Sequence, residues 1–66
     1  MTVSINGEDR DVAQGTTVAG FLAEKDLKPQ MVVVEYNGGI LPREQYDATT
    51  IESGDTLEIV QMMAGG

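Results

Sequence analysis

The absence of both Cys and His constrains this 66-residue chain more than any other feature of its sequence. A domain of this length buries only about 60% of its unfolded surface, so its core is small. Small domains often add disulfides or a bound metal to such a core, but here disulfides and Cys/His zinc sites are excluded. We therefore expect one domain over residues 1–66, held together by apolar packing.

The charge balance argues against nucleic acid and membrane partners. The formal net charge is −7, from 11 acidic and 4 basic residues. Phosphate binding needs clustered Lys and Arg, and the basic residues are spread from Arg10 to Arg43. No apolar stretch approaches the roughly 18 residues of a membrane span, and no signal-peptide pattern is present, so we expect a cytoplasmic protein. The acidic surface suits either a basic partner or solubility alone.

The beginning of the chain predicts a β-hairpin. Val3 and Ile5 alternate with polar residues, which indicates a half-buried strand. Asn6-Gly7 is the strongest short-range hairpin signal. We expect the return strand over about residues 9–13, where several charges are typical of a sheet edge.

A single apolar stripe predicts one helix after the hairpin. Thr16 or Thr17 can cap its start. The core positions follow at helical spacing and are Val18, Phe21 and Leu22. Gly20 lies inside this helix, and a close approach of the backbone to the sheet would explain it. We expect the helix to end near Asp26, because a proline follows shortly afterwards.

Three strands are predicted in the remainder. The β-branched run over residues 31–36 is typical of a central strand, residues 40–41 form a short one, and residues 56–62 form the last. A polar segment over 43–55 ends in a turn at 53–55. The order β-β-α-β-β-β predicts a two-layer α+β domain. We expect the last strand to be central and parallel to the first, with the helix as their crossover.

The sequence offers no catalytic constellation. A hydrolytic nucleophile needs a base such as His beside it, and neither a phosphate-cradling loop nor a calcium loop is present. A chain this short also leaves little room for a pocket of several hundred Å3. We therefore expect no enzyme activity and no bound cofactor.

The sequence ends in Ala64-Gly65-Gly66, and residues 63–66 are expected to form a flexible tail that reaches roughly 13 Å when extended. We expect Ala64 and Gly65 to pass through a narrow channel in a partner. The Gly66 carboxylate is ionised and unreactive toward nucleophiles at neutral pH, so it must be activated. Attack on ATP would give an acyl adenylate. A sulfur donor would convert this adenylate to a thiocarboxylate, whereas an amine would conjugate the chain to another protein.

The last predicted strand presents two apolar faces. Leu57 and Ile59 lie on one face, and Val60 and Met62 on the other. Together with Val33 and Met63, the second pair predicts a docking patch for partners. The alternative is that these side chains are ordinary isolated apolar residues at the surface.

Several segments together carry a family resemblance. They are the Thr-x-x-x-Phe-Leu helix start, Val-Val-Glu-Tyr-Asn-Gly, Leu41-Pro42-Arg43-Glu44 followed by Tyr46, the Ile51–Asp55 turn and the terminal Ala-Gly-Gly. In this order and at this length the chain resembles the ThiS family of sulfur carriers, which have a ubiquitin-like β-grasp fold. Tyr46 stands where many members have Trp, and we expect it to pack the long loop onto the core.

The resemblance implies a role in making the thiazole of thiamine. An E1-like, ThiF-like adenylyltransferase would use ATP to adenylate Gly66, and a sulfur donor would form the thiocarboxylate. A ThiG-like thiazole synthase would then accept the sulfur. The alternatives are a carrier for molybdopterin or an amino acid pathway, a modifier that conjugates through Gly66, and a binding module with an inert tail.

Overall fold

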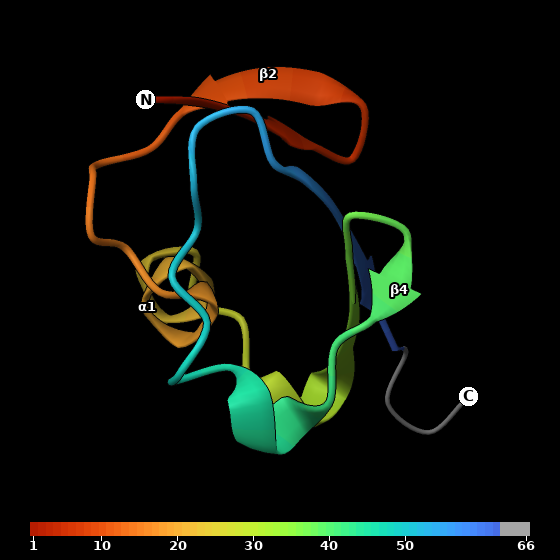
Figure 1. Cartoon of the computed structure of the whole chain (residues 1–66). Coiled ribbons are helices and arrows are strands. Elements are labelled where there is room, and N and C mark those ends of the chain that lie inside the picture. The colour runs from red at the N-terminus through yellow and green to blue at the C-terminus, as the bar shows by residue number, and fades with distance from the viewer. Residues whose placement is uncertain (63–66) are drawn as a thin grey trace.

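The last strand runs through the middle of the sheet (Figure 1). The structure, a computed structural model, describes residues 1–62. In it β5 (Thr56–Gln61) lies between β1 (Thr2–Ile5) and β3 (Val32–Tyr36), and the order of the five strands is β2-β1-β5-β3-β4. β5 is parallel to β1 and antiparallel to β3. The predicted parallel pairing of the first and last strands is therefore confirmed.

The predicted hairpin is confirmed, with a shorter return strand. Asn6 and Gly7 have φ values of 53° and 82°, as a two-residue hairpin turn with the sheet's own twist requires. β2 (Glu8–Asp11) begins directly after this turn, because Ile5 pairs with Glu8. It ends two residues before the predicted limit, and all four of its residues are exposed at the sheet edge.

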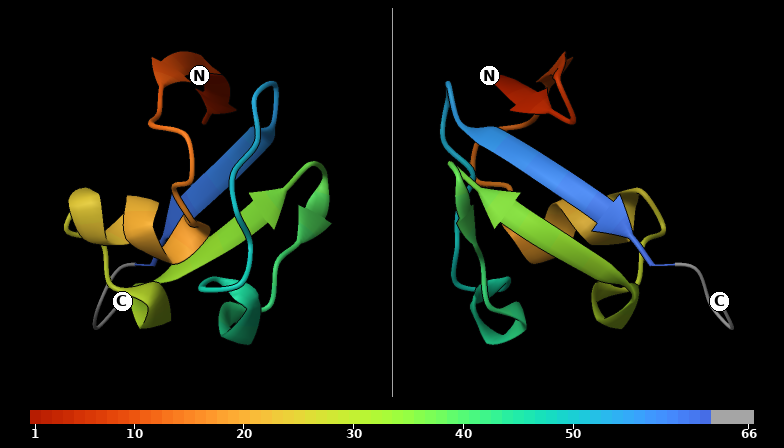
Figure 2. Two further views of the ribbon diagram at one scale, coloured as in Figure 1. Left: turned by 60° about the vertical axis from the view of Figure 1, so that its left-hand side comes forward. Right: turned by 90° about the vertical axis from the view of Figure 1, so that its right-hand side faces the viewer.

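The helix α1 (Val18–Glu24) packs on one face of the sheet (Figure 2). Thr17 caps it, since its Oγ1 accepts a hydrogen bond from the Gly20 N–H at 3.0 Å. The helix ends two residues before the predicted limit. Asp26 has a φ of 60°, a left-handed conformation that stops a helix.

The explanation expected for Gly20 is wrong. Gly20 is exposed and does not approach the sheet. A Cβ at this position would instead lie 3.2 Å from the Thr17 Oγ1. The helix faces the sheet through its buried residues, and Gly20 falls outside that stripe.

The remaining elements are short. Two 3-10 turns, η1 (Pro29–Met31) and η2 (Arg43–Gln45), flank β3 and the two-residue strand β4 (Gly39–Ile40). Met31 therefore lies in η1 rather than at the start of β3, since Pro29 opens a tight turn just before it. No helix within residues 1–62 is long and apolar enough to cross a membrane.

The core lies between α1 and the sheet and includes two residues of the polar loop. Its buried members are Val3, Ile5, Val12, Val18, Phe21, Leu22, Val32, Val34, Tyr46, Ile51 and Leu57. The predicted core positions Phe21 and Leu22 are confirmed. Tyr46 and Ile51 come from the segment before β5 and fix this long connection onto the domain, as expected for Tyr46.

Candidate partner-docking face

The face of the sheet that points away from α1, here called the outer face, is not covered by any helix or strand of residues 1–62. The right-hand view of Figure 2 shows β3 and β5 side by side with α1 behind them. Alternate side chains of a strand point to opposite faces, and directly paired residues share a face. Leu57 is buried on the inner side, so the even-numbered residues of β5 lie on the outer face together with their partners in β3.

Three of the four predicted docking residues lie together on this face. Val33 and Val60 are directly paired, and two residues further along the strands the Met62 N–H donates to the Met31 carbonyl at 2.7 Å. Val60 is 55% exposed and Met62 is 43% exposed, whereas Val33 is half-buried. The fourth residue, Met63, lies outside the described residues. The register therefore joins positions 33, 60 and 62 into one surface.

Sequence reasoning missed Ile40, which has the largest exposed fraction of the large apolar side chains in residues 1–62, at 65%. Ile40 pairs with Glu35, so it lies on the outer face beside β3. The sequence did mark a short strand here, but it did not indicate which neighbour each residue faces. Every large apolar side chain exposed in the described part of the chain, Ile40, Val60 and Met62, is on the outer face.

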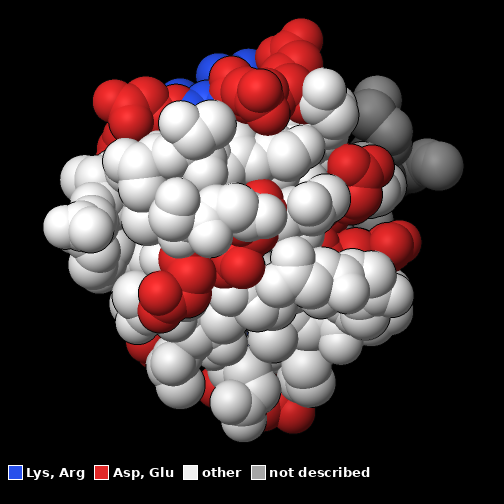
Figure 3. Space-filling view, turned by 45° about the horizontal axis from the view of Figure 1, so that its top comes forward, with Lys and Arg blue, Asp and Glu red and all other residues white. Residues whose placement is uncertain are grey.

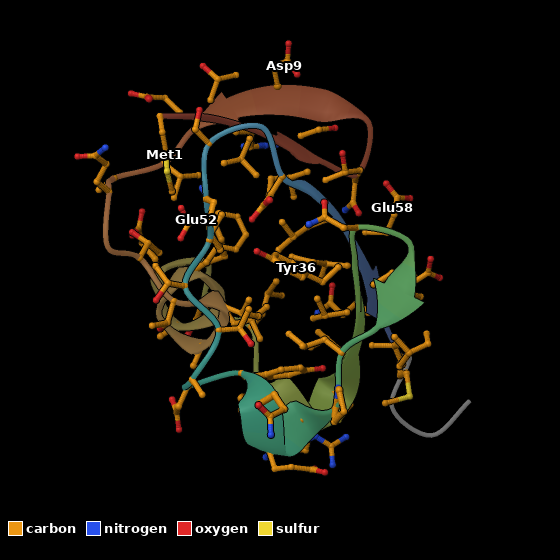
Figure 4. The ribbon with its side chains drawn as sticks, in the orientation of Figure 1. Met1, Asp9, Tyr36, Glu52 and Glu58 are labelled. Carbon is orange, nitrogen blue, oxygen red and sulfur yellow. The ribbon has the colours of Figure 1, made fainter. Side chains whose placement is uncertain are left out.

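Two carboxylates lie within this apolar surface. Glu35 pairs directly with Glu58 across β3 and β5. Figure 4 shows Glu58 pointing away from the fold, while Tyr36, the next residue after Glu35, points into it. The outer face therefore combines exposed apolar side chains with two adjacent negative charges.

A hydrogen-bonded cluster around Asp55 ties the turn after β3 to the turn before β5. The Asp55 carboxylate accepts hydrogen bonds from the Tyr36 hydroxyl, from the Asn37 Nδ2 at 3.2 Å and from the Glu52 N–H at 2.8 Å. The Asn37 Oδ1 in turn accepts from the Thr56 N–H at 2.8 Å. These contacts hold the start of β5 at the rim of the outer face.

The cluster shifts the pKa of both ionisable partners. The hydrogen bond to Asp55, followed by burial and nearby negative charge, raises the pKa of Tyr36 to about 12. Burial by itself raises the pKa of Asp55. The hydrogen bonds from its three donors outweigh that effect, so the pKa of Asp55 lies below its ordinary value.

The structure corrects the expectation that a chain this short leaves little room for a pocket of several hundred Å3. Two open hollows of about 440 and 390 Å3 lie beside the N-terminal hairpin and α1. Both are lined by Arg10 and Lys25 as well as by acidic and apolar residues. Within residues 1–62, no group of three Asp or Glu side chains is placed to hold a metal ion.

The predicted reactive end lies outside the described residues. This applies to Gly66, the predicted site of modification, and to the passage residues Ala64 and Gly65. The structure describes the strand that precedes them. β5 has neighbours on both sides, and the chain continues from its end to Met62.

The fold and the open sheet face define a ubiquitin-like β-grasp protein. A solved ThiS structure from Geobacter metallireducens superimposes with a TM-score of 0.84 and 36% identity, covering 100% of both chains. The model of the ThiS family matches residues 3–66. The chain belongs to the ThiS family, which confirms the resemblance seen in its sequence.

Curated relatives extend this comparison. The sulfur carrier protein ThiS of Escherichia coli (strain K12) is 30% identical over 66 residues, covering 100% of both chains. A thiazole synthase of Paramagnetospirillum magneticum is 38% identical over all of this chain, and a second thiazole synthase, from Magnetococcus marinus, is 33% identical. The chain spans 20% of the length of each of these two synthases.

Proposed function

We propose that this chain is a sulfur carrier protein of thiamine biosynthesis that carries sulfur as a thiocarboxylate on Gly66. The observation that carries the proposal is the match to the ThiS family over residues 3–66, which includes the terminal Ala-Gly-Gly. The full-length relative named as a sulfur carrier supports it. In this role the chain is a co-substrate that is regenerated in each cycle, and its partners supply the catalytic groups.

The proposed chemistry needs only the terminal carboxylate from this chain. A carboxylate oxygen of Gly66 attacks the α-phosphorus of ATP, and pyrophosphate leaves. Hydrosulfide, or a donor at the same oxidation level, then attacks the acyl carbon of the adenylate. The C–O bond to AMP breaks as the C–S bond forms, AMP leaves as the phosphate anion, and the S–H proton is lost to solvent. The resulting thiocarboxylate delivers its sulfur to the thiazole precursor.

The proposal includes two protein partners in the cytoplasm. One is an E1-like, ThiF-like adenylyltransferase, which supplies the ATP site. The other is a ThiG-like thiazole synthase, and two relatives with that name support it because their chains include a segment similar to this whole protein. We propose that Val33, Val60, Met62 and Met63 contribute to the surface that docks these enzymes.

The absence of cysteine makes the decisive experiment simple. The chain is incubated with a ThiF-like adenylyltransferase, ATP and sulfide, treated with a thiol-specific alkylator and measured as an intact mass. A Cys-free chain offers the alkylator no other strong sulfur nucleophile, so one tag is expected. The alkylation also separates the thiocarboxylate from a methionine oxidation, which has nearly the same mass change.

Two variants serve as controls for this experiment. Deletion of Gly66 and addition of one residue after Gly66 both move the carboxylate, and both should remove the tag. A tag on the extended chain, or no tag on the wild type with an enzyme that is active on another carrier, would overturn the proposal. An isopeptide adduct to a lysine would identify a protein modifier instead.

A further inference from the structure

Three residues form one row across the outer face. Ile40 of β4 pairs with Glu35 of β3, and Glu35 pairs with Glu58 of β5. Asn37 donates its N–H to the Thr56 carbonyl, and alternation along an antiparallel ladder makes Glu35 and Glu58 a hydrogen-bonded pair as well. Their Cβ atoms are then about 5.5 Å apart. Like charges placed directly opposite each other destabilise a sheet.

The chain does not neutralise these two carboxylates. All four of its Lys and Arg residues lie in the described part, and none forms an ion pair with Glu35 or Glu58. The basic groups make other contacts. Arg10 forms an ion pair with Glu8 at 3.2 Å, and the Lys25 ammonium lies 5.7 Å from the centre of the Phe21 ring. Arg43 donates a hydrogen bond to the Pro29 carbonyl at 3.1 Å, and Lys28 lies directly before η1.

The pair has apolar neighbours on two sides, and the polar Asn37–Thr56 pair lies next to it on a third. Ile40 closes the row at one end, and the Val33–Val60 pair lies next to it along the strands. In contrast, the Lys and Arg atoms visible in Figure 3 gather in one area near its top, among acidic side chains. Two like charges that face each other across paired strands without an ion-pair partner are unfavourable in the isolated chain, and a cation from outside would relieve this.

We propose that this row receives an arginine side chain from the enzyme that adenylates Gly66. The planar guanidinium can donate hydrogen bonds to both carboxylates at once, and its aliphatic stem packs on Ile40 and Val60. The inference rests on the proposed function and names a contact at the same docking face. An enzyme without the cation would bury two like charges unpaired, so the pair also selects against wrong partners.

The position of the row fits an enzyme that acts on the C-terminal residue, and the adenylating enzyme is the first to do so in the proposed cycle. Glu58 and Val60 belong to β5, the strand that continues toward the reactive terminus. A protein that holds this strand by its outer face also holds the beginning of the tail. The arginine contact therefore sets where the terminal residues enter the enzyme.

The test measures binding of a purified ThiF-like adenylyltransferase to the wild type and to Glu35→Gln, Glu58→Gln and the double variant. Each dissociation constant is measured at low and at high salt. We expect the double variant to bind about tenfold more weakly at low salt and to lose most of the salt dependence. Because both carboxylates share one guanidinium, the effects of the two single variants should not add.

A matched control changes the same number of charges elsewhere. Glu24→Gln with Glu44→Gln alters one exposed carboxylate on α1 and one on η2, and its affinity should stay within about twofold of wild type. The Glu35/Glu58 double variant should also melt at a higher temperature than wild type, because the repulsion across the strands is gone.

The same preparation separates the two proposals. Adenylation of the wild-type chain, followed by its thiocarboxylate tag, reports on the sulfur-carrier function alone. If the wild type is adenylated while the double variant binds with unchanged affinity and salt dependence, the arginine contact is wrong and the carrier function stands. An equal loss of affinity in the Glu24/Glu44 control would also overturn it, because net charge would then explain the effect.

Discussion

The side-chain amide of Asn6 hydrogen-bonds both backbone groups of Ile59. Its Oδ1 accepts from the Ile59 N–H at 2.7 Å, and its Nδ2 donates to the Ile59 carbonyl at 3.3 Å. The paired residues of β1 and β5 end at Ile5 and Leu57, and the last backbone hydrogen bond runs from the Asn6 N–H to the Leu57 carbonyl at 2.9 Å. The amide therefore continues this pairing by one step, from a residue that also forms the hairpin turn.

Substitutions of Asn6 should separate its two roles. Asn6→Gly suits the left-handed backbone but removes both hydrogen bonds, and we expect it to lower the free energy of unfolding by about 1–2 kcal/mol. Asn6→Ala also strains the backbone and should lose about 1 kcal/mol more. Urea unfolding measures both values. Wild-type stability in Asn6→Gly would show that the Ile59 contacts contribute nothing.

The Tyr36–Asp55 hydrogen bond should shape the pH dependence of stability. A pKa of about 12 for Tyr36 exceeds that of an unfolded tyrosine. The contribution of Tyr36 to the free energy of unfolding is therefore complete below about pH 10 and is lost between about pH 10 and 12. The lowered pKa of Asp55 acts in the opposite direction. Its contribution is present above the ordinary carboxyl range and is lost as the pH falls through the folded-state pKa.

Tyr36→Phe tests this relationship, since it removes the donor and keeps the ring. We expect it to lower the free energy of unfolding by about 1 kcal/mol at neutral pH. It should also remove the loss of stability that Tyr36 causes at alkaline pH. The acid loss contributed by Asp55 should become smaller. Urea midpoints across the pH range measure all three effects. Tyr46→Phe leaves the Asp55 cluster intact, so this variant should still lose stability at both alkaline and acid pH. If it did not, the pH dependence could not be assigned to the Tyr36–Asp55 hydrogen bond.

The helix start offers a thermodynamic cycle. Thr17→Ala removes the cap and should lower the free energy of unfolding by about 1 kcal/mol. Gly20→Ala improves helix propensity by about 1 kcal/mol, but its Cβ crowds the Thr17 Oγ1 at 3.2 Å, so little net gain is expected in the wild type. In the Thr17→Ala background the full gain should appear. Equal effects of Gly20→Ala in both backgrounds would show that this contact is not restrictive.

Val60→Asp tests the outer face as a docking surface. Val60 is exposed, so the fold should remain intact by circular dichroism and thermal melting. Affinity for a ThiF-like adenylyltransferase should fall by about tenfold or more, because a charge replaces an apolar contact. Gln14→Glu adds the same charge at an exposed position in the loop before α1 and should bind like wild type. Equal affinities of the two variants would remove Val60 from the interface.

The differences between prediction and structure have local physical causes. Met31 was expected in a strand because its neighbours are β-branched, but Pro29 places it in a 3-10 turn. Gly20 was expected to approach the sheet, yet it is exposed, and a Cβ added there would instead meet the Thr17 Oγ1 at 3.2 Å. The ends of β2 and α1 also moved, since the termini of elements depend on one or two backbone conformations such as the left-handed Asp26.

The sequence by itself determined the hairpin turn at Asn6-Gly7, a helix cap at Thr16 or Thr17, the buried stripe of the helix and membership of the ThiS family. Turns and caps depend on a few neighbouring residues, and the spacing of apolar residues predicts which side of a helix or strand is buried. Only the tertiary structure decided that Ile40, Glu35 and Glu58 form one row beside Val60. That row depends on the register between strands far apart in the chain, and the pattern within each strand does not specify which residue of its neighbour it will face.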